Sequence, residues 1–205
     1  MPYDPEKHDR RSIRLDGYDY AQPGGYFVTL CVQDRVCLFG NVVDGRMRLN
    51  RFGQVVAGRW RWLEQRYAHV RHDAWVVMPN HLHGIVVLTG GDANRGGNGG
   101  RRSSRGGSRT APTTTVNKPT PDEPTPDEPA PAKSSKRKPL GRLIGAFKTV
   151  STKRMNQMRD TPGERIWQRN FYERIVRDAR EHARIRQYIR DNPRRWNADR
   201  YRPSS

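Results

Sequence analysis

The sequence predicts an α+β domain in which helices pack on one face of an antiparallel sheet, with a long insertion in the middle of the chain. Three observations lead to this prediction. Strand-like patterns dominate the chain before residue 89, three segments have helical periodicity, and strands and helices do not alternate in regular βαβ order. The two halves of the domain are expected at residues 1–89 and 140–205, and the insertion at 90–139.

The first half is expected to begin with three strands and a helix. Residues 26–32 form a β-branched and aromatic run, which is typical of a strand. Residues 42–49 indicate a hairpin around Asp44 and Gly45, because this pair tolerates the positive φ angles of a tight turn. The apolar residues of 53–67 recur every three to four positions, which indicates a helix.

The insertion and the second half differ sharply in composition. Residues 90–139 are rich in Gly, Ser, Arg, Thr and Pro and repeat the string PTPDE, so they lack the apolar surface that folding requires and are expected to be disordered. Residues 140–158 have the spacing of an amphipathic helix, and 166–176 resemble a loop that leads into a strand. Asp178 is expected to cap a helix that ends near Asp191, before Pro193.

Charge and composition narrow the classes of partner and compartment. The 205-residue chain has a formal net charge of +18 and only 33% hydrophobic residues, which favours a polyanionic partner such as nucleic acid. No apolar run is long enough to span a bilayer, and no apolar stretch follows the charged N-terminus, so neither a membrane protein nor a signal peptide is expected. Cys31 and Cys37 are expected to be reduced thiols of a cytoplasmic protein.

His81 and His83 are the candidate metal ligands. They open a strand predicted at 82–88, after a strand at 74–78 and a break at Pro79 and Asn80. On a strand, residues two apart point to the same face, so both imidazoles would project side by side and could hold one metal ion. The alternative is that both are simply polar residues on the exposed face of a half-buried strand.

Tyr188 and Asn192 lie one helical turn apart on the predicted C-terminal helix. This spacing puts the phenol and the carboxamide on one face, from which both could reach a metal held by the histidines. The alternative is that Tyr188 is a core aromatic residue between Ile185 and Ile189. Tyr172 is the second candidate nucleophile, but it has no amide residue four positions later.

Four segments in order resemble the REP-associated tyrosine transposases, which belong to the single-tyrosine HUH transposases. These segments read GGYFVTLCVQDR, AWVVMPNHLHGIV, WQRNFYERIVRD and YIRDNPRRW, and the resemblance covers about residues 10–89 and 139–197. It implies a ferredoxin-like α+β fold, a divalent metal such as Mg²⁺ or Mn²⁺, and a single-stranded DNA substrate that carries a hairpin. Position by position, it implies His81, His83 and Asn192 as metal ligands and Tyr188 as the nucleophile.

The reaction implied by this resemblance is DNA nicking and rejoining through a 5′-phosphotyrosine. Basic and aromatic side chains of the second half are expected to contact the DNA. These are Arg184, Lys148, Arg169, Arg177 and Trp167. The alternatives are a hairpin-binding protein that does not cleave and a nuclease that uses water. The sequence leaves monomer and homodimer open.

Overall fold

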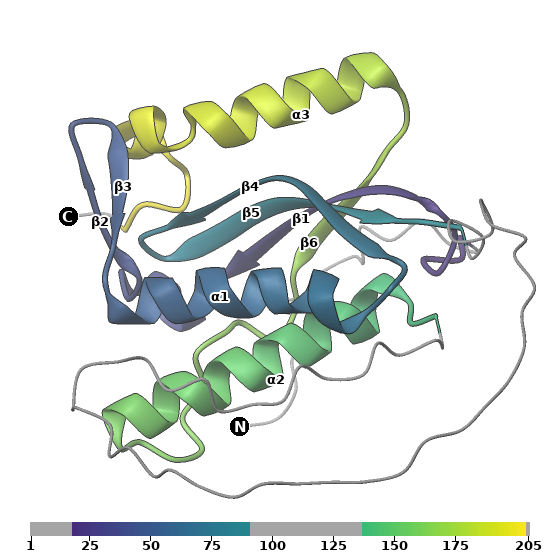
Figure 1. The fold of residues 1–205 in the computed structure, drawn as a ribbon. Helices are drawn as coiled ribbons and strands as arrows, with labels where there is room; N and C mark the ends of the chain where they lie inside the picture. Colours follow the sequence, from purple (N-terminus) through teal and green to yellow (C-terminus); the bar gives the residue numbers. More distant parts are fainter. Residues whose placement is uncertain (1–17, 91–136, 204–205) are drawn as a thin grey trace, which may run out of the picture.

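The structure, a computed structural model, describes residues 18–90 and 137–203 (Figure 1). Its elements, in chain order, are β1 (Gly24–Cys31), η1 (Gln33–Arg35), β2 (Gly40–Val43), β3 (Arg46–Leu49), α1 (Arg51–Arg66), β4 (Val70–Met78), β5 (His81–Leu88), α2 (Leu140–Arg159), β6 (Tyr172–Val176), α3 (Ala179–Asp191) and η2 (Pro193–Ala198). Almost all of the predicted insertion lies outside the described residues.

A four-stranded antiparallel sheet in the order β4-β5-β1-β6 forms the centre of the molecule. Strands β2 and β3 pair separately as a hairpin, and the expected turn residues Asp44 and Gly45 have φ angles of 51° and 67°. The predicted α+β class with an antiparallel sheet is confirmed.

Helices α1 and α2 cover one face of this sheet and bury the larger core (Figure 1). Trp60 of α1 lies against Phe147 of α2, with ring centroids 5.2 Å apart, and both side chains are fully buried. Gly84 of β5 permits this packing, because a Cβ atom there would lie 2.8 Å from the Trp60 ring. The core therefore fixes the position of the strand that carries the two histidines.

Helix α3 covers the opposite face, which corrects the expectation that all helices pack on one face (Figure 1). Its Ile185 and Ile189 pack against Phe27 of β1 and Ile85 of β5 in a small apolar cluster. Nearly every residue of β5 is buried, so its sequence does not show the alternation of a strand with one exposed face. This missing alternation is the pattern of a strand that is buried on both faces, and the prediction of helices on one face did not take it into account.

The element boundaries follow local chemistry closely, with one exception. Asp178 caps α3 as predicted, because its side chain accepts from the Glu181 amide at 2.7 Å. Strand β4 begins at Val70 rather than near residue 74, since a register shift between His72 and Trp75 interrupts the alternation on which the prediction depended.

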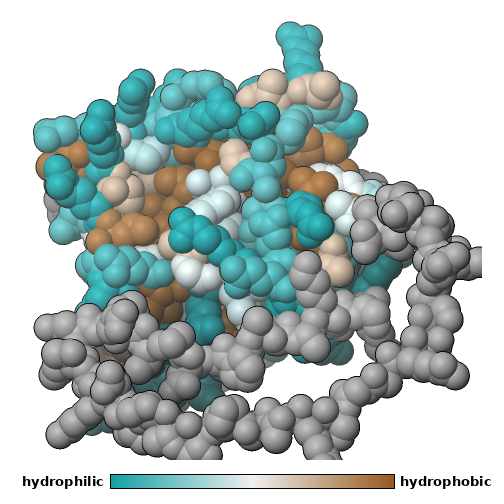
Figure 2. Space-filling view, in the orientation of Figure 1, coloured by the Kyte–Doolittle hydropathy of each residue, from teal (hydrophilic) through white to brown (hydrophobic). Residues whose placement is uncertain are grey.

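The face of the molecule that Figure 2 shows carries both hydrophilic and apolar side chains. In Figure 2, hydrophilic side chains cover the part where α3 runs, and apolar side chains are visible between α3 and α1. Within residues 18–90 and 137–203, no helix has the length and apolar character needed to cross a bilayer.

Candidate functional site

His81 and His83 lie side by side at the start of β5, on the face that α3 covers. Their ring centroids are 4.5 Å apart and both residues are 0% exposed. Leu82 between them is buried in the core on the other face, as predicted. The two histidines are therefore not polar residues of an exposed strand face, because no part of either residue contacts solvent.

Asn80 determines which nitrogen of His81 is free. The Asn80 amide nitrogen donates to the carbonyls of Arg35, at 2.9 Å, and Tyr201, at 2.6 Å. The Asn80 carbonyl oxygen must then face His81 Nδ1, which lies 2.8 Å away. Because that oxygen can only accept, Nδ1 carries the proton in the neutral ring, and the Nε2 lone pair points into the site.

His83 connects the sheet to the tyrosine helix. Its Nδ1 lies 2.8 Å from Thr29 Oγ1 on β1, and its Nε2 lies 3.2 Å from the Tyr188 hydroxyl. Burial lowers the pKa of His81 to about 3 and the pKa of His83 well below its ordinary value. Both imidazoles are therefore neutral near pH 7, which is the form that binds a metal ion.

Tyr188 and Asn192 both face the histidines from α3 and its C-terminal cap. Asn192 keeps helical φ and ψ angles of −54° and −43° although a proline follows it, so the expected spacing from Tyr188 is preserved. Tyr188 is 36% exposed, whereas Asn192 is 2% exposed and its Oδ1 atom has no hydrogen-bond partner among the described residues. Burial and nearby Asp199 raise the pKa of the Tyr188 phenol, while Arg200 and Asn192 act to lower it.

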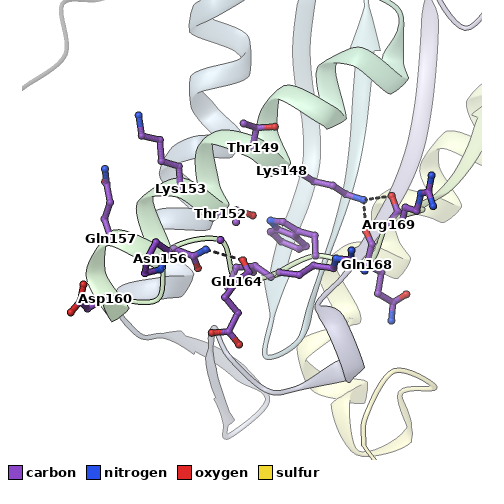
Figure 3. A pocket seen from close by; sticks show the side chains of 15 residues that line it. Lys148, Thr149, Thr152, Lys153, Asn156, Gln157, Asp160, Glu164, Gln168 and Arg169 are labelled. Carbon is purple, nitrogen blue, oxygen red and sulfur yellow. Dashed lines mark hydrogen bonds between the residues drawn. The ribbon is translucent and has the colours of Figure 1, made fainter.

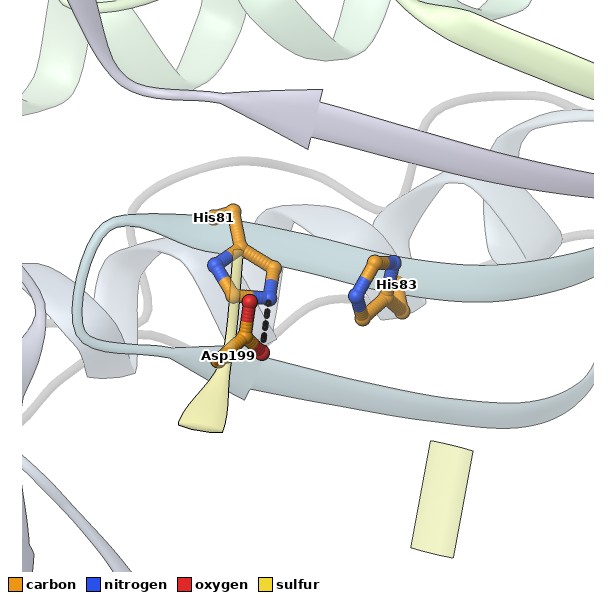
Figure 4. A group of neighbouring side chains, drawn as sticks. All are labelled: His81, His83 and Asp199. Atoms are coloured by element: carbon orange, nitrogen blue, oxygen red, sulfur yellow. Dashed lines mark ion pairs between the residues drawn. The ribbon is translucent and has the colours of Figure 1, made fainter. Parts of the chain in front are cut away.

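Asp199 and Tyr201, which were not predicted, also belong to this site. The Asp199 side chain is 4% exposed and its Oδ2 atom lies 3.8 Å from His81 Nε2 (Figure 4). Ligand atoms of His81, His83 and Asp199 all lie within 4.8 Å of one another. The Tyr201 ring packs against both imidazoles, with centroids 4.8 Å from His81 and 5.7 Å from His83.

The donor atoms at this site fit a cation. The Nε2 atom of His81, like the Asn192 oxygen, has no hydrogen-bond partner among the residues that the structure describes. Buried lone pairs without donors are costly, and a divalent ion bound by imidazole and oxygen ligands would satisfy them.

Tyr172, the second candidate nucleophile, lies on the same face of the sheet. It stands opposite Thr29 in the β1–β6 pairing, and its ring meets Phe27 edge-on at 6.0 Å. The chain therefore brings both candidate tyrosines to the histidine face, and Tyr188 is the one whose hydroxyl lies 3.2 Å from His83.

Arg184 and Arg177, two of the five predicted DNA contacts, lie at the surface around α3. The Arg184 side chain is 70% exposed and lies 3.7 Å from Glu181, so α3 presents it to solvent rather than to the Tyr188 hydroxyl. Arg200 is the cation that interacts electrostatically with the phenol of Tyr188. The sequence gave no sign of Arg200, which follows η2 in an irregular segment.

The other three predicted contacts line a pocket of about 880 Å³ beside α2 (Figure 3). They are Lys148, Arg169 and Trp167. The Lys148 ammonium donates to the carbonyls of Gln168, Arg169 and Asn170, which uses its three protons. The Trp167 indole is 4% exposed and donates to Ser151. As DNA contacts, all five residues stay predictions, and the structure does not bring these three to the histidine site.

Comparison with known proteins identifies the fold and then the family. No model of a protein family matches the sequence. A REP-associated tyrosine transposase solved with a bound REP hairpin aligns with a TM-score of 0.53 and 16% identity, over 91% of this chain and 74% of its own. The chain thus has the fold of this class of transposase, and the resemblance seen in the four motifs is confirmed at the level of the fold.

A sequence relative defines the family more narrowly. A Haemophilus influenzae protein, described as uncharacterized, is 31% identical over 195 residues, which are 94% of this chain and 92% of that protein. The chain belongs to the same family as this protein.

Proposed function

We propose that the protein is a single-tyrosine enzyme that nicks and rejoins single-stranded DNA next to a hairpin. One observation carries the proposal: the Tyr188 hydroxyl lies 3.2 Å from His83 Nε2, in a site that also contains His81 and Asn192. A candidate nucleophile and three candidate metal ligands thus meet within one chain. The net charge of +18 supports a polyanionic substrate, and the transposase with the similar fold was solved with a DNA hairpin bound.

The histidine site would hold a divalent metal such as Mg²⁺ or Mn²⁺ through His81, His83 and Asn192. When bound, such an ion supplies Lewis-acid polarisation of a phosphate and offsets negative charge that develops on it. The chain's own contribution is to keep both imidazoles neutral and correctly oriented, through Asn80 for His81 and Thr29 for His83.

Tyr188 would attack the scissile phosphorus. As the bond from the tyrosine oxygen to phosphorus forms, the bond from phosphorus to the 3′ oxygen breaks, which leaves a 5′-phosphotyrosine and a 3′-hydroxyl. The phenol loses its proton to water and the leaving oxygen gains one. Burial raises the pKa of Tyr188, so the reaction needs nearby positive charge, and Arg200 supplies a cation from this chain. The covalent bond preserves the phosphodiester energy for strand transfer.

The proposal is tested by trapping the covalent intermediate. The wild-type protein is incubated with Mn²⁺ and hairpin DNA that is labelled internally on the 3′ side of the cut, so that the strand joined to the tyrosine keeps the label. The products are separated by denaturing electrophoresis. We expect a labelled protein band that depends on Mn²⁺ and disappears in Tyr188→Phe. Tyr172→Phe is the matched control, because Tyr172 lies on the same sheet face, and its band should persist.

A non-cleaving hairpin-binding protein is the second candidate function. The raised pKa of the Tyr188 phenol favours it, because a protonated phenol is a poor nucleophile. This candidate predicts hairpin binding without a labelled band, and with the same affinity in wild type and Tyr188→Phe. A nuclease that uses water would instead cut the DNA, form no band, and stay active as Tyr188→Phe.

A further inference from the structure

We infer that Asp199 is an additional, anionic ligand of the metal held by His81 and His83, so that the C-terminal segment completes the metal site. The inference rests on the metal dependence of the proposed function and adds a ligand from a third part of the chain. It is based on the short distance between Asp199 Oδ2 and His81 Nε2, which lie 3.8 Å apart on side chains that are 4% and 0% exposed (Figure 4).

The hydrogen bonding around His81 leaves no proton between these two atoms. Asn80 fixes the ring proton on Nδ1, at 2.8 Å from the Asn80 oxygen, so Nε2 presents a lone pair to the carboxylate. Two lone pairs that face each other in a buried site repel each other. A cation between them converts this repulsion into attraction, whereas a carboxylate that only orients His81 would need a proton on Nε2.

Within residues 18–90 and 137–203, the Asp199 oxygen that faces His81 makes no hydrogen bond. Asp199 Oδ1 accepts from the Tyr201 amide at 2.8 Å and so stabilises the final turn. Asp199 Oδ2 is the atom directed at the histidine, and its side chain is 4% exposed. A structural role therefore accounts for one carboxylate oxygen and leaves the other for a ligand.

The charge of the site also favours this assignment. A bare carboxylate beside Tyr188 would repel a DNA phosphate, which opposes the proposed reaction. Bound to a divalent ion, the same carboxylate contributes to a site of two imidazoles and one carboxylate, a donor set known for divalent transition metals. Asn192, whose oxygen has no partner among the described residues, completes the group of donors.

The test measures Mn²⁺ binding to the full chain without DNA, by the loss of the electron paramagnetic resonance signal of free Mn²⁺. The variants are Asp199→Asn, which keeps the Oδ1 acceptor for Tyr201, and Asp191→Asn as a matched control. Asp191 is a carboxylate on α3 that bonds Gln187 and lies 4.0 Å from Arg195, away from the histidines. We expect Asp199→Asn to weaken Mn²⁺ binding by about ten-fold or more, and Asp191→Asn to leave it unchanged.

The outcomes separate this inference from the proposed function. If wild type and Asp199→Asn bind Mn²⁺ equally, while His81→Ala does not bind it, Asp199 is not a ligand and the proposed metal site stands. If Asp199→Asn only lowers the melting temperature at unchanged Mn²⁺ affinity, its role is structural and the inference is overturned. If the wild type does not bind Mn²⁺ at all, both the inference and the metal site of the proposed function fail.

Discussion

The two faces of the sheet differ in what they bury. The face under α1 and α2 buries a continuous apolar core of aromatic and aliphatic side chains, which includes Trp60 and Phe147. The face under α3 has an apolar cluster of four buried residues, and beside it the buried polar groups of His81, His83 and Asn192.

This difference separates stability from function. Apolar burial on the first face supplies the free energy that offsets the cost of holding neutral histidines and an unpartnered amide on the second. The apolar core under α1 and α2 therefore stabilises the polar site on the opposite face, and substitutions on the two faces should have different consequences.

The largest effect on stability is expected on the α1–α2 face. Phe147→Ala should lower the free energy of unfolding by about 3–5 kcal/mol, because it empties a fully buried aromatic site next to Trp60. Ile185→Ala on the α3 face should cost about 2 kcal/mol, because Ile185 is 8% exposed and its cluster is small. Urea unfolding of both variants measures these changes in the free energy of unfolding. Equal decreases in the two variants would contradict the proposed difference between the two faces.

Asn80→Ala is expected to affect both stability and the site. It removes the donor for the carbonyls of Arg35 and Tyr201 and the acceptor for His81 Nδ1, so the free energy of unfolding should fall by about 1–3 kcal/mol. Mn²⁺ affinity should fall by about ten-fold or more, because the ring loses its fixed tautomer. Asn41→Ala, on the exposed hairpin strand β2, is the control. Normal Mn²⁺ affinity in Asn80→Ala would contradict the orienting role of Asn80.

A buried histidine on the α1–α2 face gives a pH-dependent prediction. His72 stacks on Trp60 at 4.7 Å, and burial lowers its pKa to about 4, so its 3.7 Å approach to Glu64 is not an ion pair near pH 7. The unfolded chain binds this proton first, so stability should fall as pH drops from 6.5 toward 4. Relative to wild type, His72→Phe should therefore gain about 1–2 kcal/mol between pH 7 and pH 5 in urea unfolding. A pH-independent difference would be inconsistent with a neutral buried ring.

The smallest effects are expected from single surface cations. If Arg184 on α3 contacts a phosphate, Arg184→Gln should reduce the salt dependence of single-stranded DNA binding by about 0.7 in log–log slope. Arg169→Gln applies the same measurement to the pocket beside α2. DNA-binding titrations at several salt concentrations give this slope for each variant and show whether the DNA contacts one of these regions or both. A slope equal to that of the wild type in both variants would show that neither residue contacts the DNA.

Much of the fold followed from the sequence because its signals are local. The turn at Asp44 and Gly45, the cap at Asp178 and the helical periodicities each depend on neighbours within a few residues. The placement of α3 on the second face did not follow, since it depends on long-range packing against Phe27 and Ile85.

The site could be predicted only in part for the same reason. His81 and His83 are two apart on a strand, and Tyr188 and Asn192 four apart on a helix, so each pair follows from local geometry. Asp199 lies far along the chain from the histidines, at the C-cap of the short 3-10 helix η2. No spacing rule connects it to them, and only the folded chain brings its carboxylate within 3.8 Å of His81.

The most direct test of the central claim identifies the atom that joins protein and DNA. The wild-type protein is reacted with hairpin DNA and Mn²⁺, digested with protease and nuclease, and analysed by tandem mass spectrometry for a peptide with a nucleotide adduct. The account predicts the adduct on Tyr188, the tyrosine whose hydroxyl lies 3.2 Å from His83. An adduct on Tyr172 or Tyr201, or DNA cleavage without any adduct, would contradict it.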